Sequence, residues 1–292
     1  MEYERLLSRY KYAELRIERG VVSRASIKDD EVRHSSGSYY GASIRVLEGG
    51  SWGFASSSNE DIVPLLEKAG RLAALNSGKI ELIIPPIVKK EIKDKAEPVD
   101  EEGQMKALSD VSNEMKAEKI TSRSVNCSDA VVRKEFYSSH GSEIIQESCY
   151  TFLSCSCVAK EGAIMQRGSD RASSRKGFGA LELHKSAEGS REKALRLLKA
   201  APPPKGRFIV IFDNEMTGVF AHEALGHACE ADSIVERESI LSDRMGKQIG
   251  NSLVSVIDDP GADDFGRYAY DDEGVVGKPV TLIEKGVLLG FL

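Results

Sequence analysis

Long apolar stretches are absent from this sequence of 292 residues. Runs such as Phe208–Phe212 fall far short of the roughly 20 residues that a membrane-spanning helix needs. The first residues, Met1 to Arg5, are followed by no apolar core, so we expect no secretory signal there. A membrane is therefore not an expected partner.

Cysteines are few, and basic residues are outnumbered by acidic ones. Five cysteines, an odd number without the spacing of a disulfide framework, favour reduced thiols and a cytoplasmic protein. Three of them, Cys149, Cys155 and Cys157, are separated by even numbers of residues and would share one face of a strand, so we expect core packing. Acidic residues (46) outnumber basic ones (40), and the net charge of −6 disfavours nucleic acid as the main partner.

Apolar residues are present in the proportion of an ordinary globular protein. Hydrophobic residues make up 41% and charged residues 29%, which is enough apolar material for a sizeable core. Shifts in composition divide the chain into three units. We predict an α+β protein with an N-terminal mixed α/β domain over 1–84, a central antiparallel β domain with helices over 85–204, and a third domain over 205–292.

The N-terminal unit contains clear strand and helix patterns. Apolar residues alternate with polar ones around Leu15, which predicts a strand. Residues 43–56 predict a hairpin that turns at Glu48–Gly50. Apolar residues then recur at helical spacing from Ile62 to Ala73, with Ser58 or Asn59 as the expected cap.

The central unit is predicted to start with a linker and to be rich in strands. Pro85, Pro86 and the charged stretch 89–102 indicate the linker. A helix is expected over 101–116, and a second over 190–200, where a run of three prolines ends it. Between 119 and 175 the pattern has period two, and turn signals at His140-Gly141 and Glu161-Gly162 suggest four antiparallel strands.

The third unit begins with an expected short buried strand over 207–212. Asp213 or Asn214 would cap the helix that follows. A hairpin is predicted around Lys285-Gly286. The sequence stops in the apolar stretch Leu288–Leu292, so we expect it to be part of a longer protein.

The helix after residue 213 carries the pattern His-Glu-x-x-x-His, with His222, Glu223 and His227. In the zinc-protease motif H-E-x-x-H the histidines are four residues apart and share one helix face. Here they are five apart, which on an ideal helix leaves the rings about 140° apart. A π-bulge would absorb the extra residue, and Gly226 would ease it. The spacing alone leaves a second interpretation, a simple surface pair between Glu223 and His227.

The segment around these histidines resembles the TldD/PmbA family, also called modulators of DNA gyrase, whose active members carry H-E-x-x-x-H. The resemblance covers most of the sequence and is strongest from about 190 onward. It includes these segments, in order: Gly41–Val46, Gly53–Ser56, Ala194–Lys199 with the proline run, His222–His227 with Glu230–Asp232, Asp258–Pro260, Tyr270–Gly274 and Ile283–Leu288.

The resemblance implies a zinc-dependent intracellular peptidase that hydrolyses peptides or unfolded segments. Residues 205–292 would be the first part of a β-rich C-terminal metallopeptidase domain that carries the motif helix. His222 and His227 would be metal ligands, and Glu223 the general base that activates zinc-bound water. The family's third ligand is a cysteine expected beyond Leu292, and Cys229 is expected to pack as a small apolar residue.

The resemblance also implies a homodimer, or a heterodimer with a paralogue that lacks the histidine motif. The alternative function is therefore that of a non-catalytic subunit that binds peptides or acts as a scaffold. The intact motif favours the catalytic half. A gyrase-associated regulator has only the historical family name in its favour.

Overall fold

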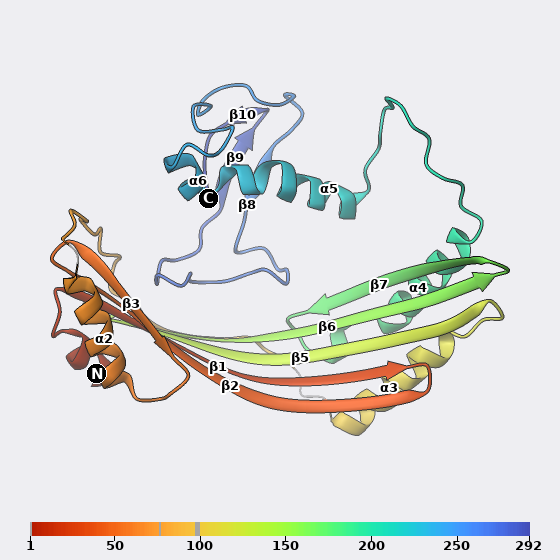
Figure 1. Cartoon of the computed structure of the whole chain (residues 1–292), viewed down its shortest axis with the longest axis horizontal. Helices are drawn as coiled ribbons and strands as arrows, with labels where there is room; N and C mark the ends of the chain where they lie inside the picture. The colour runs from red at the N-terminus through yellow and green to blue at the C-terminus, as the bar shows by residue number, and fades with distance from the viewer. Residues whose placement is uncertain (1, 76, 97–99) are drawn as a thin grey trace. The chain divides into compact units, whose positions relative to one another are not determined.

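The computed structural model describes residues 2–75, 77–96 and 100–292, which form two compact units (Figure 1). The first comprises the chain up to Ala201 together with Tyr270–Val275, and the second comprises Pro202–Ala269 and Val276–Leu292. Each unit combines helices with antiparallel strands, which confirms the α+β prediction. No helix within the described ranges is long and apolar enough to cross a membrane.

The first unit is built on a seven-stranded sheet. Its order is β3-β2-β1-β5-β6-β4, and β7 also pairs with β6. The strands are β1 (Tyr12–Lys28), β2 (Glu31–Glu48), β3 (Ser51–Ser57), β4 (Lys89–Lys93), β5 (Ile120–Ser138), β6 (Glu143–Glu161) and β7 (Ile164–Ser174). All neighbours are antiparallel except β4 and β6, which are parallel.

The hairpins form where the turn residues predict them. Strands β2 and β3 pair from Ala42 opposite Ser57 to Glu48 opposite Ser51. Gly49 and Gly50 make the turn with φ of +58° and +73°, a left-handed conformation that glycine adopts without steric cost. The hairpin predicted over 43–56 is therefore confirmed.

Two predictions for the central region are wrong. The stretch 119–175 forms three strands rather than four, because the two predicted turns are the only breaks and the strands between them reach 19 residues. The charged stretch after Pro86 is not all linker, since Lys89–Lys93 pairs with Glu143–Glu147 as β4. The charged side chains of this stretch do not show a strand pattern, and its backbone is stabilised by pairing with β6, which is distant in sequence.

In the described part of this unit four helices accompany the sheet: α1 (Glu2–Leu7), α2 (Ile62–Ala74), α3 (Glu101–Glu114) and α4 (Leu183–Leu197). Asp61 caps α2 through the Val63 amide, at 3.3 Å, instead of the predicted Ser58 or Asn59. Helix α4 starts before the predicted Ser190, after a short 3₁₀ turn, η1 (Phe178–Ala180). In Figure 1, α3 and α4 lie on the same face of the sheet.

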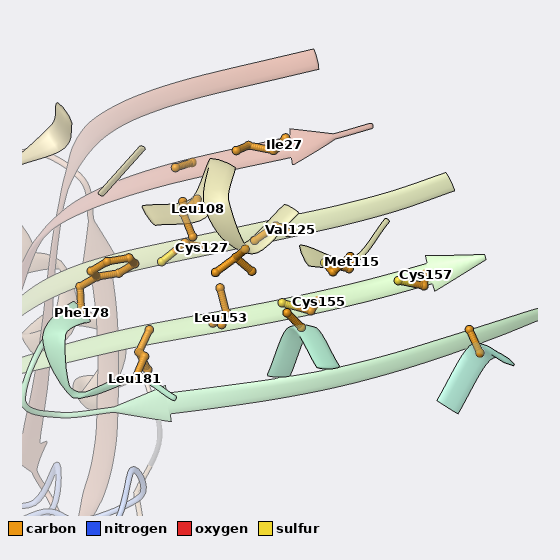
Figure 2. Packing of buried hydrophobic residues seen from close by; sticks show 14 of the residues in the cluster. Ile27, Leu108, Met115, Val125, Cys127, Leu153, Cys155, Cys157, Phe178 and Leu181 are labelled. Carbon is orange, nitrogen blue, oxygen red and sulfur yellow. The ribbon is translucent and has the colours of Figure 1, made fainter. Parts of the chain in front are cut away.

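That face of the sheet carries two buried apolar clusters. One packs α1 and α2 against β1, β2 and β3 around Leu15, Ile44 and Leu66. The other lies between α3, α4 and strands β1, β5, β6 and β7; Figure 2 shows Leu108, Met115 and Leu153 converging there. Cys127, Cys155 and Cys157 belong to this second cluster and Cys149 is also buried, so the expected core packing of the cysteines is confirmed.

The second unit contains short elements. They are α5 (Asn214–Ala221), η2 (His222–Gly226), η3 (His227–Cys229), α6 (Ala231–Val235), β8 (Val256–Asp258), β9 (Val280–Glu284) and β10 (Val287–Leu288). The three strands form a small antiparallel sheet, and the predicted hairpin turns at Lys285 and Gly286.

The prediction of a buried strand over 207–212 is wrong. This segment has no regular structure, and its side chains are exposed, with Ile209 at 100% and Ile211 at 94%. A strand needs a neighbouring backbone to satisfy its amides, and the small sheet β10-β9-β8 does not include this segment. The apolar composition predicted burial, but the described residues supply no partner strand.

Candidate metal centre

The motif lies at the end of a capped helix. The side chain of Asp213 accepts a hydrogen bond from the Met216 amide at 2.9 Å, so the predicted cap of α5 is confirmed. Helix α5 then continues without interruption into η2, because Ala221 and His222 both keep right-handed helical dihedrals. The cap therefore determines where the helix that leads into the motif begins.

The segment η2 is a π-helical turn, as the five-residue spacing predicted. The amide of His227 donates to the carbonyl of His222, a bond between residues i and i+5. Gly226 contributes less than predicted, since its φ of −51° and ψ of −59° suit any residue. A Cβ there would lie 3.8 Å from the Ala221 carbonyl, an ordinary contact, so the turn does not require glycine.

The π turn brings the three motif side chains together. One ligand atom each from His222, Glu223 and His227 lies within 4.8 Å of the others, and all three side chains are accessible to solvent. The two imidazole rings have centroids 4.6 Å apart at an interplanar angle of 74°. Two imidazole nitrogens and a carboxylate are donors that zinc prefers, so the residues present fit a zinc ion.

The partner of His227 is not Glu223 but Glu230. Nδ1 of His227 lies 2.7 Å from Oε1 of Glu230. This hydrogen bond, together with the negative charge of Glu230, raises the pKa of His227. Asp232 is engaged elsewhere, since its carboxylate accepts the Ser233 amide at 2.7 Å. The surface pair between Glu223 and His227 that the spacing allowed is therefore not the contact observed.

No cysteine belongs to this group of side chains. All five cysteines are buried, and burial raises the pKa of the thiol of Cys229, the one closest in sequence. Cys229 is fully buried among Leu241, Leu282 and Leu288, which confirms that it packs as a small apolar residue. Its packing fixes the segment that follows His227 onto β9 and β10.

Sequence reasoning missed the role of Glu230. The sequence places Glu230 in the segment that resembles the family but predicts no contact between Glu230 and His227. The signal was its spacing of three residues after His227, which brings two side chains together on a helix. It was hidden because the helix ends here: Glu230 has an extended ψ of 123° and precedes α6.

Three family models match the chain in consecutive order. Domain 1 of the PmbA/TldA metallopeptidases matches residues 13–73, the central domain matches 89–198, and the C-terminal domain matches 205–292. The motif helix therefore falls within the part that matches the C-terminal metallopeptidase domain.

Curated relatives are also described as metalloproteases. A metalloprotease of Methanocaldococcus jannaschii is 39% identical over 306 residues, covering 99% of this chain and 67% of the relative. A zinc metalloprotease TldD homolog of Saccharolobus solfataricus is 29% identical, covering 96% of this chain and 64% of the relative. The chain thus spans about two thirds of the length of these relatives.

Solved structures show the same fold at low identity. TldE from Thermococcus kodakarensis has a TM-score of 0.75 at 19% identity, covering 100% of this chain and 68% of that one. A protein of Bacteroides thetaiotaomicron described as a candidate modulator of DNA gyrase has a TM-score of 0.85 at 18% identity, covering 100% and 69%. The three family models and the relative at 39% identity establish that this chain belongs to the TldD/PmbA family of metallopeptidases.

Proposed function

We propose that this chain carries the zinc site of an intracellular peptidase that hydrolyses peptides or unfolded segments. The observation that supports it best is the π turn, which brings one ligand atom each from His222, Glu223 and His227 within 4.8 Å of the others. In an α-helix the same spacing would point the two imidazole rings in different directions. Names of relatives as metalloproteases point to the same chemistry. The five unpaired cysteines favour a reducing, cytoplasmic location.

In this proposal His222 and His227 hold the metal through their imidazoles. A zinc ion there would act as a Lewis acid that polarises the peptide carbonyl and lowers the pKa of water. The family's third ligand, a cysteine, is not among the five cysteines here, because none of them is in the group. We therefore propose that a third ligand comes from additional sequence of the kind that the longer relatives contain.

Glu223 is the proposed general base. Its carboxylate is accessible and lies within reach of both imidazoles, so it can accept the proton of the attacking water. A carboxylate suits this role because it carries a negative charge near neutral pH and only accepts hydrogen bonds. The exposed position of all three side chains leaves room for an extended peptide.

Replacing Glu223 separates catalysis from binding. In the full-length protein, Glu223→Gln should keep about one zinc per chain and abolish hydrolysis of an unfolded protein, because an amide cannot take up the proton. His222→Ala should lose most of the zinc, measured by elemental analysis, because one of few ligands is gone. Glu215→Gln, in the same helix but outside the group, is the matched control.

The outcomes distinguish the proposed function from its alternative. Hydrolysis at the wild-type rate by Glu223→Gln would exclude Glu223 as the base. Equal zinc in His222→Ala and wild type would exclude the ligand assignment. A wild-type protein that binds peptides without cleaving them would instead indicate the peptide-binding or scaffold subunit, in a homodimer or paired with a paralogue.

A further inference from the structure

The imidazole of His227 makes one contact that the proposed function does not use. Its Nδ1 lies 2.7 Å from Oε1 of Glu230. An ionised carboxylate only accepts hydrogen bonds, so the imidazole must donate from Nδ1. In a neutral ring that assignment leaves Nε2 without a proton and with its lone pair available.

We propose that Glu230 is a positioning residue that holds His227 in the tautomer with the proton on Nδ1, and so presents Nε2 as the nitrogen that binds metal. The inference rests on the proposed function only in naming metal as the ligand of Nε2. A neutral histidine in water has both tautomers available, and a carboxylate fixed behind the ring selects one of them.

The backbone fixes Glu230 on both sides. The amide of Leu292 donates to the Cys229 carbonyl at 2.8 Å, and the amide of Ala231 donates to the Leu292 carbonyl at 2.9 Å. Cys229, directly before Glu230, is fully buried in the apolar cluster of this unit. The carboxylate therefore extends from a backbone that is anchored to the small sheet, although the side chain itself is accessible.

The nearby carboxylate of Asp232 has a different partner. Asp232 accepts the amide of the next residue, Ser233, at 2.7 Å. Glu230 is likewise not part of the group formed by His222, Glu223 and His227. Its carboxylate is engaged by Nδ1, which assigns it to orienting a ligand instead of serving as one.

The chain contains a matched control pair outside this unit. Nδ1 of His184 in α4 lies 2.9 Å from the carboxylate of Glu114 in α3. Both histidines therefore have an accessible carboxylate at Nδ1, but only His227 has a second histidine beside it. Replacing Glu114 tests the hydrogen bond alone, without any effect on the motif.

The experiment measures the tautomer directly in the metal-free chain. Histidine is labelled with ¹⁵N, and long-range ¹H–¹⁵N spectra are recorded at about pH 9, where an imidazole is neutral. Wild type should show His227 protonated at Nδ1. Glu230→Ala should shift His227 toward protonation at Nε2, and Glu114→Ala should shift only His184.

The conservative variant separates orientation from charge. Glu230→Gln retains a carbonyl oxygen that accepts from Nδ1, so it should keep the wild-type tautomer. A His227 that has the same tautomer in wild type and in Glu230→Ala would overturn the proposal, as would protonation at Nε2 in wild type. Because the tautomer is read without metal, its failure is distinct from a failure to bind zinc.

Discussion

Glu14 is the residue whose burial most needs a partner. Only 1% of its side chain is exposed, although it lies on β1 among acidic and basic neighbours. Arg16 and Arg45 both pair with its carboxylate, and the hydroxyl of Tyr12 donates to it at 3.0 Å. A buried carboxylate is tolerated only when charge and hydrogen bonds compensate its desolvation, and here three side chains do so.

The buried cysteines carry the first residue-scale prediction. Burial raises the pKa of the Cys155 thiol to about 12 and, together with the charge of Asp129, that of Cys127 to about 12. The thiolate is the nucleophile, so the native protein should react negligibly with a thiol reagent at about pH 8. The same reagent should count five thiols per chain after unfolding in guanidinium.

The sign of the pH dependence follows from these two groups. Their native pKa lies above that of an unfolded thiol, about 8.5, so the folded state binds more protons than the unfolded state at high pH. The free energy of unfolding should therefore lose this contribution as pH rises from about 8.5 toward 12. Fast modification of the native protein at pH 8 would contradict the burial on which this depends.

At the residue scale the sequence predicted the group of three side chains but not its support. The spacing of His222 and His227 predicted a π turn, because such a turn takes up one extra residue and brings residues five apart onto one face. The contact from Glu230 did not follow from its spacing alone, since it depends on where the helix ends and on the pairing of Leu292 with residues 229 and 231. The roles of the three motif residues remain proposals.

At the scale of elements, helix α4 packs unusually close to the edge strand β7. A Cβ built on Gly168 of β7 would lie 2.2 Å from the Ser190 carbonyl and 2.3 Å from the Ala194 amide. These atoms are backbone, so they cannot rotate away as a flexible side chain would. Glycine is therefore required for the contact between the helix and the strand.

Substitution of this glycine should destabilise the first unit. Gly168→Val should lower the free energy of unfolding by about 1–3 kcal/mol, because overpacking forces the helix outward. Urea unfolding followed by circular dichroism measures it. Gly37→Ala in β2 is the matched control, since a Cβ there meets nothing within 4 Å, and its effect should stay within about 1 kcal/mol. Equal stabilities of Gly168→Val and wild type would show that the helix can move freely.

Elements were predictable where a local signal determines them. The turns at Gly49-Gly50 and Glu161-Gly162 gave the hairpins, because the glycines adopt positive φ. Strand β4 was missed, since Lys89–Lys93 is charged and pairs with residues more than 50 positions away. The prediction of a buried strand over 207–212 was wrong for the opposite reason. The apolar composition of this segment indicated burial, but no strand of the small sheet pairs with it.

At the scale of the whole molecule, one sheet carries both apolar clusters of the first unit. Strand β1 contributes Leu15 to one cluster and Ile27 to the other, so the two are linked by continuous backbone. The segment Tyr270–Val275 belongs to the same unit, where the Gln146 side chain makes two hydrogen bonds with the backbone of Tyr270, at 2.9 and 3.0 Å. The division into domains at 84 and 204 remains a prediction.

The last prediction concerns zinc binding by residues 1–292 alone. A catalytic zinc usually has three protein ligands and an open position, and three ligands hold the ion far more tightly than two. Within the described residues the metal centre offers two imidazoles, His222 and His227, and a carboxylate that we assign to proton transfer. All five cysteines are buried, and none of them belongs to the group of His222, Glu223 and His227.

We therefore expect residues 1–292 to lose zinc on dialysis against a mild chelator and to cleave no unfolded protein, whereas the full-length protein keeps zinc and activity under the same conditions. Elemental analysis and a peptide-release assay, run side by side, measure both properties. If residues 1–292 stayed zinc-loaded and active, a carboxylate would have to be the third ligand. Glu223→Gln and Glu230→Gln would then identify which one by loss of zinc, and loss with Glu230→Gln would also contradict its assignment as a positioning residue.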